Sequence, residues 1–256
     1  MLQFENLSAG YNRRERLHGI TAAIRSGCLT AVIGPNGCGK TTLLKCAAGI
    51  LKPFSGSIQF DGRILSSFSE KERARFISYM PQSRLTPDLS VRHLVEHGRY
   101  PHLKWGQNIS EVDKKIISNA LNRTEMESLA DRSVAQLSGG ERQRAYLAMM
   151  LAQQTPLMLL DEPTTYLDLS AQFSLMTLLR TLCHDGQTAV IVLHDLSLAL
   201  EFADDIILLQ SGKLIACGSP AEVFASGMLQ NVFGITVDRT TDGRYLFAPQ
   251  KQEKPS

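Results

Sequence analysis

The chain has 256 residues, of which 43% are hydrophobic and 20% charged, so its composition is that of a globular protein rather than a disordered one. Its net charge of +2 is too small to indicate nucleic acid or a lipid surface as a partner. No apolar run approaches the ~20 residues of a spanning helix, the start resembles no signal peptide, and the five cysteines form no Cys-x-x-Cys pair. We therefore expect a cytosolic protein with reduced thiols.

Short apolar runs alternate with longer helical patterns along the chain, which predicts an α/β fold with a mainly parallel sheet flanked by helices. Three segments near the start, 2–7, 18–24 and 57–60, resemble antiparallel strands that lean on this sheet. The expected strands of the sheet itself are 29–33, 77–80, 157–160 and 189–193. Each of these four ends at a polar or glycine-rich turn, which is where open α/β sheets bind their ligands.

The strand pattern disappears between residues 85 and 155. Helices are expected at 91–99, 110–123 and 140–153, each with a polar residue near its start that could cap it. Residues 206–209 and 214–216 predict a hairpin with a turn at Ser211 and Gly212, and the polar tail 240–256 is expected to be loose. We expect one domain, with a core of about 1–84 and 156–218, a helical subdomain of about 85–155 and a C-terminal extension of about 219–256.

A glycine-rich loop follows the strand 29–33, and an apolar helix is expected at 41–48. This is the context of a phosphate-binding P-loop, whose glycines let backbone N–H groups surround the β- and γ-phosphates. Lys40 would neutralise the terminal phosphates, and the Thr41 hydroxyl would bind Mg²⁺. The flanking strand and helix disfavour the alternative, a turn that matches by accident. The expected ATP-binding residues are Gly34, Pro35, Asn36, Gly37, Cys38, Gly39, Lys40, Thr41 and Thr42. We expect the Cys38 side chain to be a small buried thiol rather than a redox switch.

Two adjacent carboxylates, Asp161 and Glu162, end the strand 157–160. Consecutive side chains of a strand point to opposite sides, so the two are expected to have different roles. Asp161 suits the outer sphere of Mg²⁺, and Glu162 could polarise the attacking water as a general base, which contributes about 10²–10⁴-fold in rate. The four apolar residues before the pair disfavour a merely exposed acidic pair.

Polar residues also end two further strands. His194 could sense the γ-phosphate, although a histidine at a strand end is by itself more often structural. Gln82, as an uncharged donor and acceptor, could contact both Mg²⁺ and the water. The residue alone leaves this role and a structural one equally open.

The segment Leu137-Ser138-Gly139-Gly140-Glu141-Arg142-Gln143 completes an ordered set of motifs with the P-loop, Gln82, Asp161, Glu162, Asp168 and His194. Over nearly the whole chain, this set resembles an ATP-binding cassette (ABC) ATPase. The resemblance implies a RecA-like parallel core with an antiparallel β subdomain and an inserted helical subdomain, and hydrolysis of ATP with Mg²⁺. Ser138 and its two glycines precede the expected helix 141–153 and would form a second anion site.

The resemblance also implies a head-to-tail dimer of two copies. In it Ser138, Gly139 and Gly140 would act in trans on ATP held by the other copy, and Asp168 would cross the interface. Tyr11 matches the position that stacks on adenine, and its alternative is an exposed tyrosine on a surface turn.

Two segments resemble a narrower group, the ATPases of importers for ferric siderophores, ferric citrate, haem and vitamin B12. They are the D-loop form Thr164-Thr165-Tyr166-Leu167-Asp168 and the segment Gly98-Arg99-Tyr100-Pro101-His102, with Pro156 following 151–154. This resemblance implies a peripheral subunit on the cytoplasmic face of the inner membrane that energises uptake of an iron(III) chelate. Its implied partners are two integral membrane permease subunits and, indirectly, a substrate-binding protein, with no nucleic acid.

Three other classes of protein stay open. A soluble cassette protein acting on nucleic acid or ribosomes usually has two cassettes or a long coiled coil, and an exporter or lipid-extracting ATPase would share the same motor. A P-loop kinase would need no Leu-Ser-Gly-Gly segment. Which molecule is transported is not encoded here, because specificity resides in the partners.

Some polar residues are expected to be ordinary solvated surface. His93 and His97 are four residues apart and could bind metal, but no further ligand is evident, so an exposed helix face is favoured. The remaining charged residues are expected on a solvated turn (Arg13, Arg14, Arg16) and a solvated helix face (Lys71, Arg73, Arg75).

Overall fold

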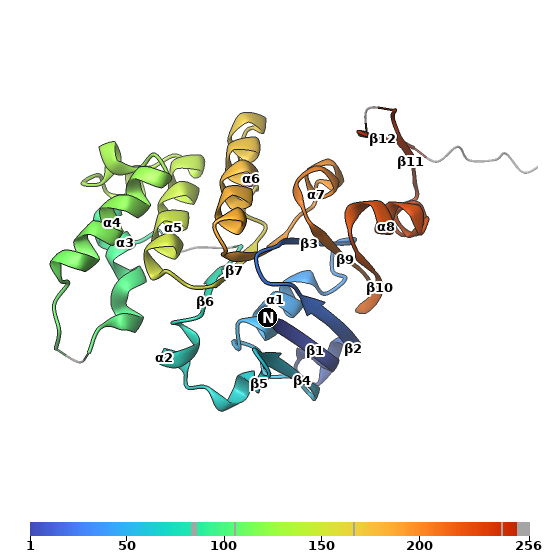
Figure 1. The fold of residues 1–256 in the computed structure, drawn as a ribbon, viewed down its shortest axis with the longest axis horizontal. Helices are drawn as coiled ribbons and strands as arrows, with labels where there is room; N and C mark the ends of the chain where they lie inside the picture. Colours follow the sequence, from blue (N-terminus) through green and yellow to red (C-terminus); the bar gives the residue numbers. More distant parts are fainter. Residues whose placement is uncertain (83–85, 105, 166, 242, 250–256) are drawn as a thin grey trace, which may run out of the picture.

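The computed structural model describes residues 1–82, 86–104, 106–165, 167–241 and 243–249. Tyr166, on which part of the metal-chelate resemblance depends, lies outside these residues. A six-stranded sheet with the order β10-β9-β3-β8-β7-β6 crosses the molecule (Figure 1). Its strands are β3 (Leu29–Ile33), β6 (Ile77–Met80), β7 (Leu157–Asp161), β8 (Thr188–Val192), β9 (Asp205–Gln210) and β10 (Lys213–Gly218).

All neighbours in this sheet are parallel except β10, which forms the expected hairpin with β9. Ser211 and Gly212 turn that hairpin with φ of 48° and 78°, values typical of a two-residue type I′ turn. Every residue of β3, β7 and β8 is buried, as in parallel strands covered on both faces. The predicted parallel sheet is confirmed, with β8 beginning and ending one residue before the expected 189–193.

Helices and a second sheet cover the two faces. Alternate residues of β3 point to opposite sides, so Ala31 and Ile33 pack with the helices α5 (Gly139–Gln153), α6 (Leu169–His184) and α7 (Leu196–Phe202). Val32 packs instead with α1 (Lys40–Ala47) and the antiparallel sheet. Helix α1 begins and ends one residue before the predicted 41–48. In Figure 1, α6 and α7 lie on one side of the parallel strands, and α1 with the antiparallel strands on the other.

The antiparallel sheet has the order β2-β1-β4-β5. It contains β1 (Leu2–Tyr11), β2 (Arg14–Ile24), β4 (Ser55–Phe60) and β5 (Arg63–Ile64). The predicted strands 2–7 and 18–24 were too short, because irregularities between Phe4, Leu7 and Ala9 break the alternation in β1. Asn12 and Arg13 close a tight hairpin with φ of 51° and 60°, and the arginines beside it are exposed as expected.

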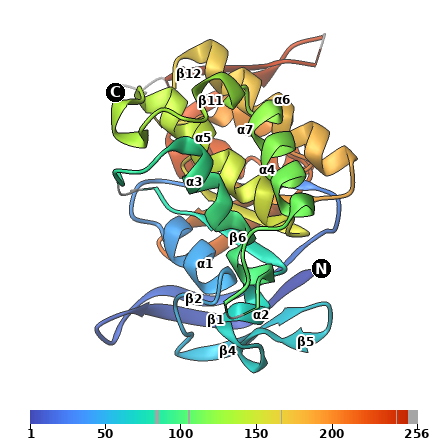
Figure 2. The same cartoon turned by 90° about the vertical axis from the view of Figure 1, so that its left-hand side faces the viewer.

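The region from 86 to 155 is helical, with no strand among its described residues (Figure 2). It contains α3 (Val91–Glu96), the 3₁₀ helix η2 (His97–His102), α4 (Glu111–Arg123), η3 (Glu127–Leu129), η4 (Val134–Gln136) and α5 (Gly139–Gln153). Serines cap α3, α4 and α5. The predicted α-helix 91–99 is wrong beyond Glu96. There the chain tightens into a 3₁₀ helix that includes Pro101, which has no N–H to donate.

A short segment with η1 (Leu65–Ser67) and α2 (Glu70–Arg73) joins the antiparallel sheet to β6 and contacts the helical region. The prediction of a solvated face is confirmed for Lys71 and Arg75, which are exposed, whereas Arg73 is half-buried. All three also donate to backbone carbonyls. Lys71 Nζ donates to Leu103 O at 2.6 Å, and Arg75 Nε to Pro101 O at 2.9 Å. Arg73 donates to the carbonyl of Phe68.

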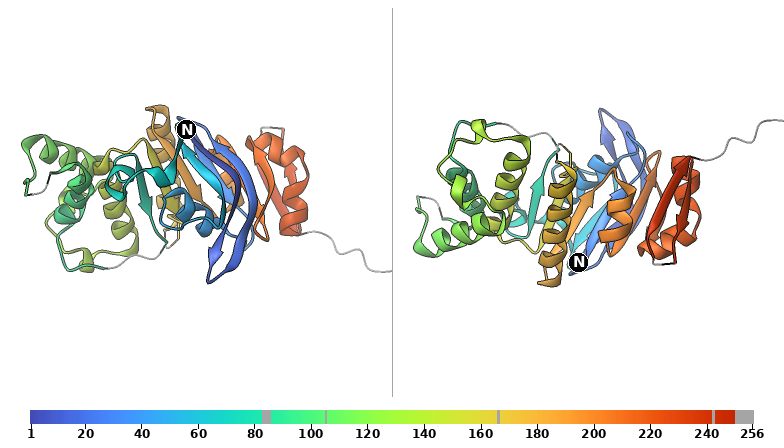
Figure 3. Two further views of the ribbon diagram at one scale, coloured as in Figure 1. Left: turned by 90° about the horizontal axis from the view of Figure 1, so that it is seen from below. Right: turned by 90° about the horizontal axis from the view of Figure 1, so that it is seen from above.

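The C-terminal residues form α8 (Pro220–Ala225), α9 (Met228–Phe233) and a two-stranded sheet of β11 (Ile235–Arg239) and β12 (Tyr245–Pro249). The prediction of a loose tail is therefore wrong for 245–249. Tyr245 and Phe247 pack against the core, and the Tyr245 ring lies 5.3 Å from that of Phe224. Figure 3 shows this segment at the end of the molecule opposite the helical region. No helix among the described residues is long and apolar enough to span a membrane.

Candidate active site

The glycine-rich loop lies between the end of β3 and the start of α1. Gly34, Gly37 and Gly39 have φ of 149°, 76° and 109°, which residues with a Cβ rarely adopt. A Cβ on Gly34 would collide with the carbonyl oxygen of Leu209, and one on Gly39 would lie 2.7 Å from Leu17 Cδ2. The loop therefore depends on these glycines for its backbone conformation and for its close packing against the core.

Lys40 points back into the loop. The residue is 5% exposed, and Nζ donates to the carbonyl oxygens of Gly34 at 2.7 Å and Pro35 at 3.1 Å. The loop thus surrounds an ammonium group, with Asn36 and Gly37 exposed at its tip. Cys38 is buried, and burial raises the pKa of its thiol, so the expected buried thiol is confirmed.

Asp161 lies against α1. The Thr41 hydroxyl donates to its Oδ1 at 3.0 Å, and the Tyr79 hydroxyl donates to its Oδ2 at 3.4 Å. Asp161 is 1% exposed, and this burial raises the pKa of its carboxyl, an effect that the Thr41 hydrogen bond opposes. A hydroxyl and a carboxylate oxygen side by side are hard oxygen ligands of the kind that Mg²⁺ prefers, so these residues fit that ion.

Glu162 has different neighbours from Asp161, as expected for adjacent residues whose side chains point to opposite sides of the sheet. Its Oε2 accepts from Gln82 Nε2 at 2.5 Å, and its Oε1 lies 2.5 Å from His194 Nε2. The Glu162 side chain is 11% exposed and its backbone has a φ of 51°, in the left-handed region. Such strained backbone clusters at functional sites. The polar residues that follow β6, β7 and β8 therefore meet at one carboxylate.

Ser138 lies on the helical region and is exposed. It caps α5 reciprocally with Glu141: Glu141 N donates to Ser138 Oγ at 3.3 Å, and Ser138 N donates to Glu141 Oε2 at 2.8 Å. Gly139, which the prediction placed before the helix, is its first residue, and Gly140 is half-buried. The structure places this segment on a different element from the Glu162 cluster.

Two further predicted residues also lie apart from that cluster. Asp168 is exposed and caps α6, where its Oδ1 accepts from Ala171 N at 2.8 Å. Tyr11 is 41% exposed at the end of β1, and Lys45 Nζ lies 5.7 Å from its ring centroid. His93 and His97 lie elsewhere, on the helical region, and no cluster of three potential metal ligands occurs among the described residues.

Two residues near the site were missed. Gln143 is buried on α5, and its side-chain amide donates to the carbonyl oxygen of Pro163, one residue after Glu162. It was visible in the sequence as the last residue of the Leu137-to-Gln143 segment. Tyr79 was visible as the only aromatic residue of β6. Neither partner could be read from the sequence, because each contact spans elements far apart in the chain.

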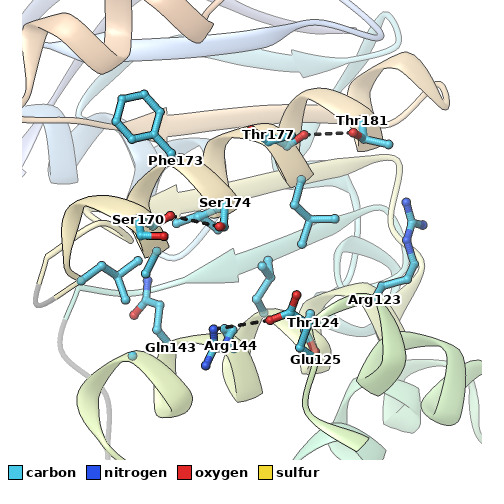
Figure 4. A pocket seen from close by; sticks show the side chains of 16 residues that line it. Arg123, Thr124, Glu125, Gln143, Arg144, Ser170, Phe173, Ser174, Thr177 and Thr181 are labelled. Carbon is cyan, nitrogen blue, oxygen red and sulfur yellow. Dashed lines mark hydrogen bonds and ion pairs between the residues drawn. The ribbon is translucent and has the colours of Figure 1, made fainter.

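A cavity of about 640 Å³ lies between α5 and α6 (Figure 4). Gly140 and Gln143 line one wall, and Ser170 and Ser174 line the other. The P-loop residues do not contribute to it. The helical region and the parallel core therefore meet along an incompletely filled boundary, next to the contact of Gln143 with Pro163.

A P-loop on the carboxyl edge of a parallel sheet, beside a buried carboxylate that suits Mg²⁺ and a second carboxylate held by polar groups, defines a P-loop ATPase. The sequence model of the ABC transporter family matches residues 17–165. The chain belongs to this family, as the resemblance of its motifs predicted.

Similar proteins agree with this assignment. The chain is 40% identical over 260 residues to the ferric enterobactin transport ATP-binding protein FepC of Escherichia coli (strain K12), covering 100% of this chain and 96% of that protein. It is 40% identical over 245 residues to the iron(3+)-hydroxamate import ATP-binding protein FhuC of Bacillus subtilis (strain 168), covering 95% and 91%. The dimeric structure of a bacterial ABC transporter cassette matches with a TM-score of 0.77 and 29% identity, covering 86% and 99%.

Proposed function

We propose that this chain is the ATP-hydrolysing subunit of an importer that moves an iron(III) chelate, such as a ferric siderophore, across the inner membrane. The observation that carries the catalytic part is the position of Glu162, held at 2.5 Å by both Gln82 and His194 beside the P-loop. The two relatives named for ferric enterobactin and iron(3+)-hydroxamate support the cargo.

ATP binds through the P-loop, whose N–H groups and Lys40 surround the β- and γ-phosphates. Thr42 follows at the start of α1, where the helix N-terminus adds partial positive charge. Thr41 and Asp161 would hold Mg²⁺, with Gln82 as its further predicted contact. The ion, when bound, neutralises charge on the phosphates.

Glu162 directs a water molecule at the γ-phosphate. The water oxygen bonds to the γ-phosphorus and the bond from that phosphorus to the β–γ bridging oxygen breaks, so ADP leaves with the electron pair. Glu162 accepts the proton of the water. Gln82 and His194 hold the carboxylate in place, and His194, whose side chain is 46% exposed, can also reach a bound γ-phosphate.

The site needs a second copy of the chain. Ser138 and Gly139 are exposed on the helical region, and the N-terminal amides of α5 next to them attract an anion from outside the chain. In a head-to-tail dimer Ser138, Gly139 and Gly140 would close on ATP held by the partner, with Asp168 at the interface. Tyr11 offers the exposed ring on which adenine would stack.

The transport partners are two integral membrane permease subunits and, through them, a substrate-binding protein. The chain would lie peripherally on the cytoplasmic face of the inner membrane and bind no nucleic acid. Closure of the dimer would pull on the permeases through the surface around Gln82 and the helical region. The domain boundaries at about 85, 156 and 219 separate the parts that would move.

Uptake by cells that lack this chain tests the proposal. We expect ferric siderophore uptake to be lost, restored by the wild-type chain and not by Glu162→Gln. Co-purification of the tagged chain should yield polytopic membrane subunits. Unchanged uptake together with co-purified ribosomal RNA or DNA would instead establish the soluble nucleic-acid class.

A further inference from the structure

Asp161 has a hydrogen-bond donor on each carboxylate oxygen, and the two donors belong to different elements. Thr41, on α1, donates to Oδ1 at 3.0 Å, and Tyr79, on β6, donates to Oδ2 at 3.4 Å. Strand β6 pairs with β7 in parallel, with Tyr79 opposite Leu159, two residues before Asp161. The phenol therefore reaches the carboxylate from the neighbouring strand.

Tyr79 is suited to be a fixed donor. Its ring is half-buried and packs against the apolar cluster that α1 shares with the antiparallel sheet. A phenol hydroxyl is protonated at neutral pH and can donate a hydrogen bond. A carboxylate that is 1% exposed needs such donors, because a buried acceptor without a partner is costly.

We infer that Tyr79 is a positioning residue for the Mg²⁺ site: by holding Oδ2 of Asp161, it turns Oδ1 toward Thr41 and the ion. The inference rests on the proposed role of Asp161. Partners that orient a metal ligand from behind typically contribute about 10–100-fold in metal affinity. Because the bond is long, at 3.4 Å, we expect an effect below this range, roughly 3–10-fold.

Tyr79→Phe keeps the ring and removes only the hydroxyl oxygen. The measurement is Mn²⁺ binding by electron paramagnetic resonance with a non-hydrolysed ATP analogue, alongside binding of the analogue in EDTA. We expect a roughly 3–10-fold weaker Mn²⁺ affinity with unchanged metal-free nucleotide affinity. Tyr100→Phe is the matched control, because Tyr100 is 55% exposed on η2 and should alter neither quantity.

An unchanged Mn²⁺ affinity in Tyr79→Phe would overturn the inference, and so would an equal loss of metal-free nucleotide binding, since that indicates a general disturbance. Tyr79→Met repeats the test if the phenylalanine variant fails to fold. Asp161→Asn separates the two levels of argument. If it binds Mn²⁺ like the wild type, the proposed role of Asp161 fails. If it loses Mn²⁺ while Tyr79→Phe does not, only the role of Tyr79 fails.

Discussion

The P-loop and the Ser138 segment are both phosphate-binding candidates, but they are built differently. Lys40 and Asp161 are 5% and 1% exposed and are fixed by partners on α1, the P-loop and the parallel sheet. Ser138 is exposed. Its hydroxyl and its backbone N–H both hydrogen-bond to Glu141, in the first turn of the same helix. The first site is prepared inside one chain, whereas the second presents its N–H groups outward. One half of the site is therefore complete, and the other is available to a second chain.

The largest expected effect comes from removing Glu162, the proposed base next to the P-loop. Glu162→Gln keeps the size of the side chain and the contact with Gln82 but cannot accept a proton. We expect turnover to fall by about 10²–10⁴-fold, while ATP still binds. Because ATP then persists between two copies, gel filtration with ATP should show a dimer.

Glu201→Gln is the matched control, since Glu201 is exposed at the end of α7 and should leave turnover unchanged. A Glu162→Gln protein that stays monomeric with ATP and hydrolyses it normally would refute the scheme. A Glu162→Gln protein that stays monomeric and has lost its turnover would support the role of Glu162 as the base but contradict the proposed dimer.

The second effect tests whether the P-loop binds nucleotide without the other half. Lys40→Ala removes the ammonium group enclosed by the loop. Charged hydrogen bonds contribute about 1.5–3 kcal/mol, so we expect ATP affinity to fall roughly 10–100-fold. Calorimetry on the monomer measures it, with the exposed Lys52→Ala as control. An affinity equal to that of the wild type would remove the role of Lys40.

The third effect addresses the comparison directly. Ser138→Ala should lower turnover about tenfold, the cost of one hydrogen bond to a charged group. Mixing it with Lys40→Ala creates dimers in which one site joins an intact P-loop to an intact Ser138 segment. With random pairing, activity should rise to roughly a quarter of the wild-type value. If the P-loop and the Ser138 segment acted within one chain, mixing the two variants would not raise the activity.

Loss of the helix cap is the competing explanation for Ser138→Ala, because it costs about 1 kcal/mol of stability. Ser219→Ala controls for it, since Ser219 caps α8 in the same reciprocal way with Glu222. That variant should be destabilised to a similar extent and hydrolyse ATP at the wild-type rate.

The P-loop side of the site and the helical region also differ in how much of their arrangement could be predicted from the sequence. The strands ending at Gln82, Glu162 and His194 were predictable, because a short apolar run followed by a polar residue identifies both the strand and its carboxyl end. Their meeting at Glu162 follows from parallel pairing. The contact of Gln143 with Pro163 did not follow, since it depends on how the helical region sits against the core. Strand β12 was missed because Tyr245 and Phe247 become a packed face only once β11 pairs with them.

The last prediction concerns the interactions that stabilise the helical region, where we expect the smallest effect on turnover. Arg99 and Asp113 form a buried pair, with Nε donating to Oδ1 at 2.8 Å, and Arg99 also donates to Ala152 O at 2.7 Å. Hydrogen bonds from Ser110 and then Arg99 lower the pKa of Asp113 from 3.8 to about 2. A lowered pKa contributes stability that is present above pH 3.8 and is lost as the pH falls toward 2.

Asp113→Asn removes this titration. We expect its urea midpoint to lie below that of the wild type at pH 7, because Arg99 keeps no counter-charge, and the difference to shrink as the pH falls through this window. Asp185→Asn breaks the exposed pair with Arg123, between α4 and the core, and should change stability by about 0–1 kcal/mol at most. If Asp185→Asn were instead the more destabilising, the helical region would depend on the core rather than on its own interior. It could then not present Ser138 to a second chain as an independent body.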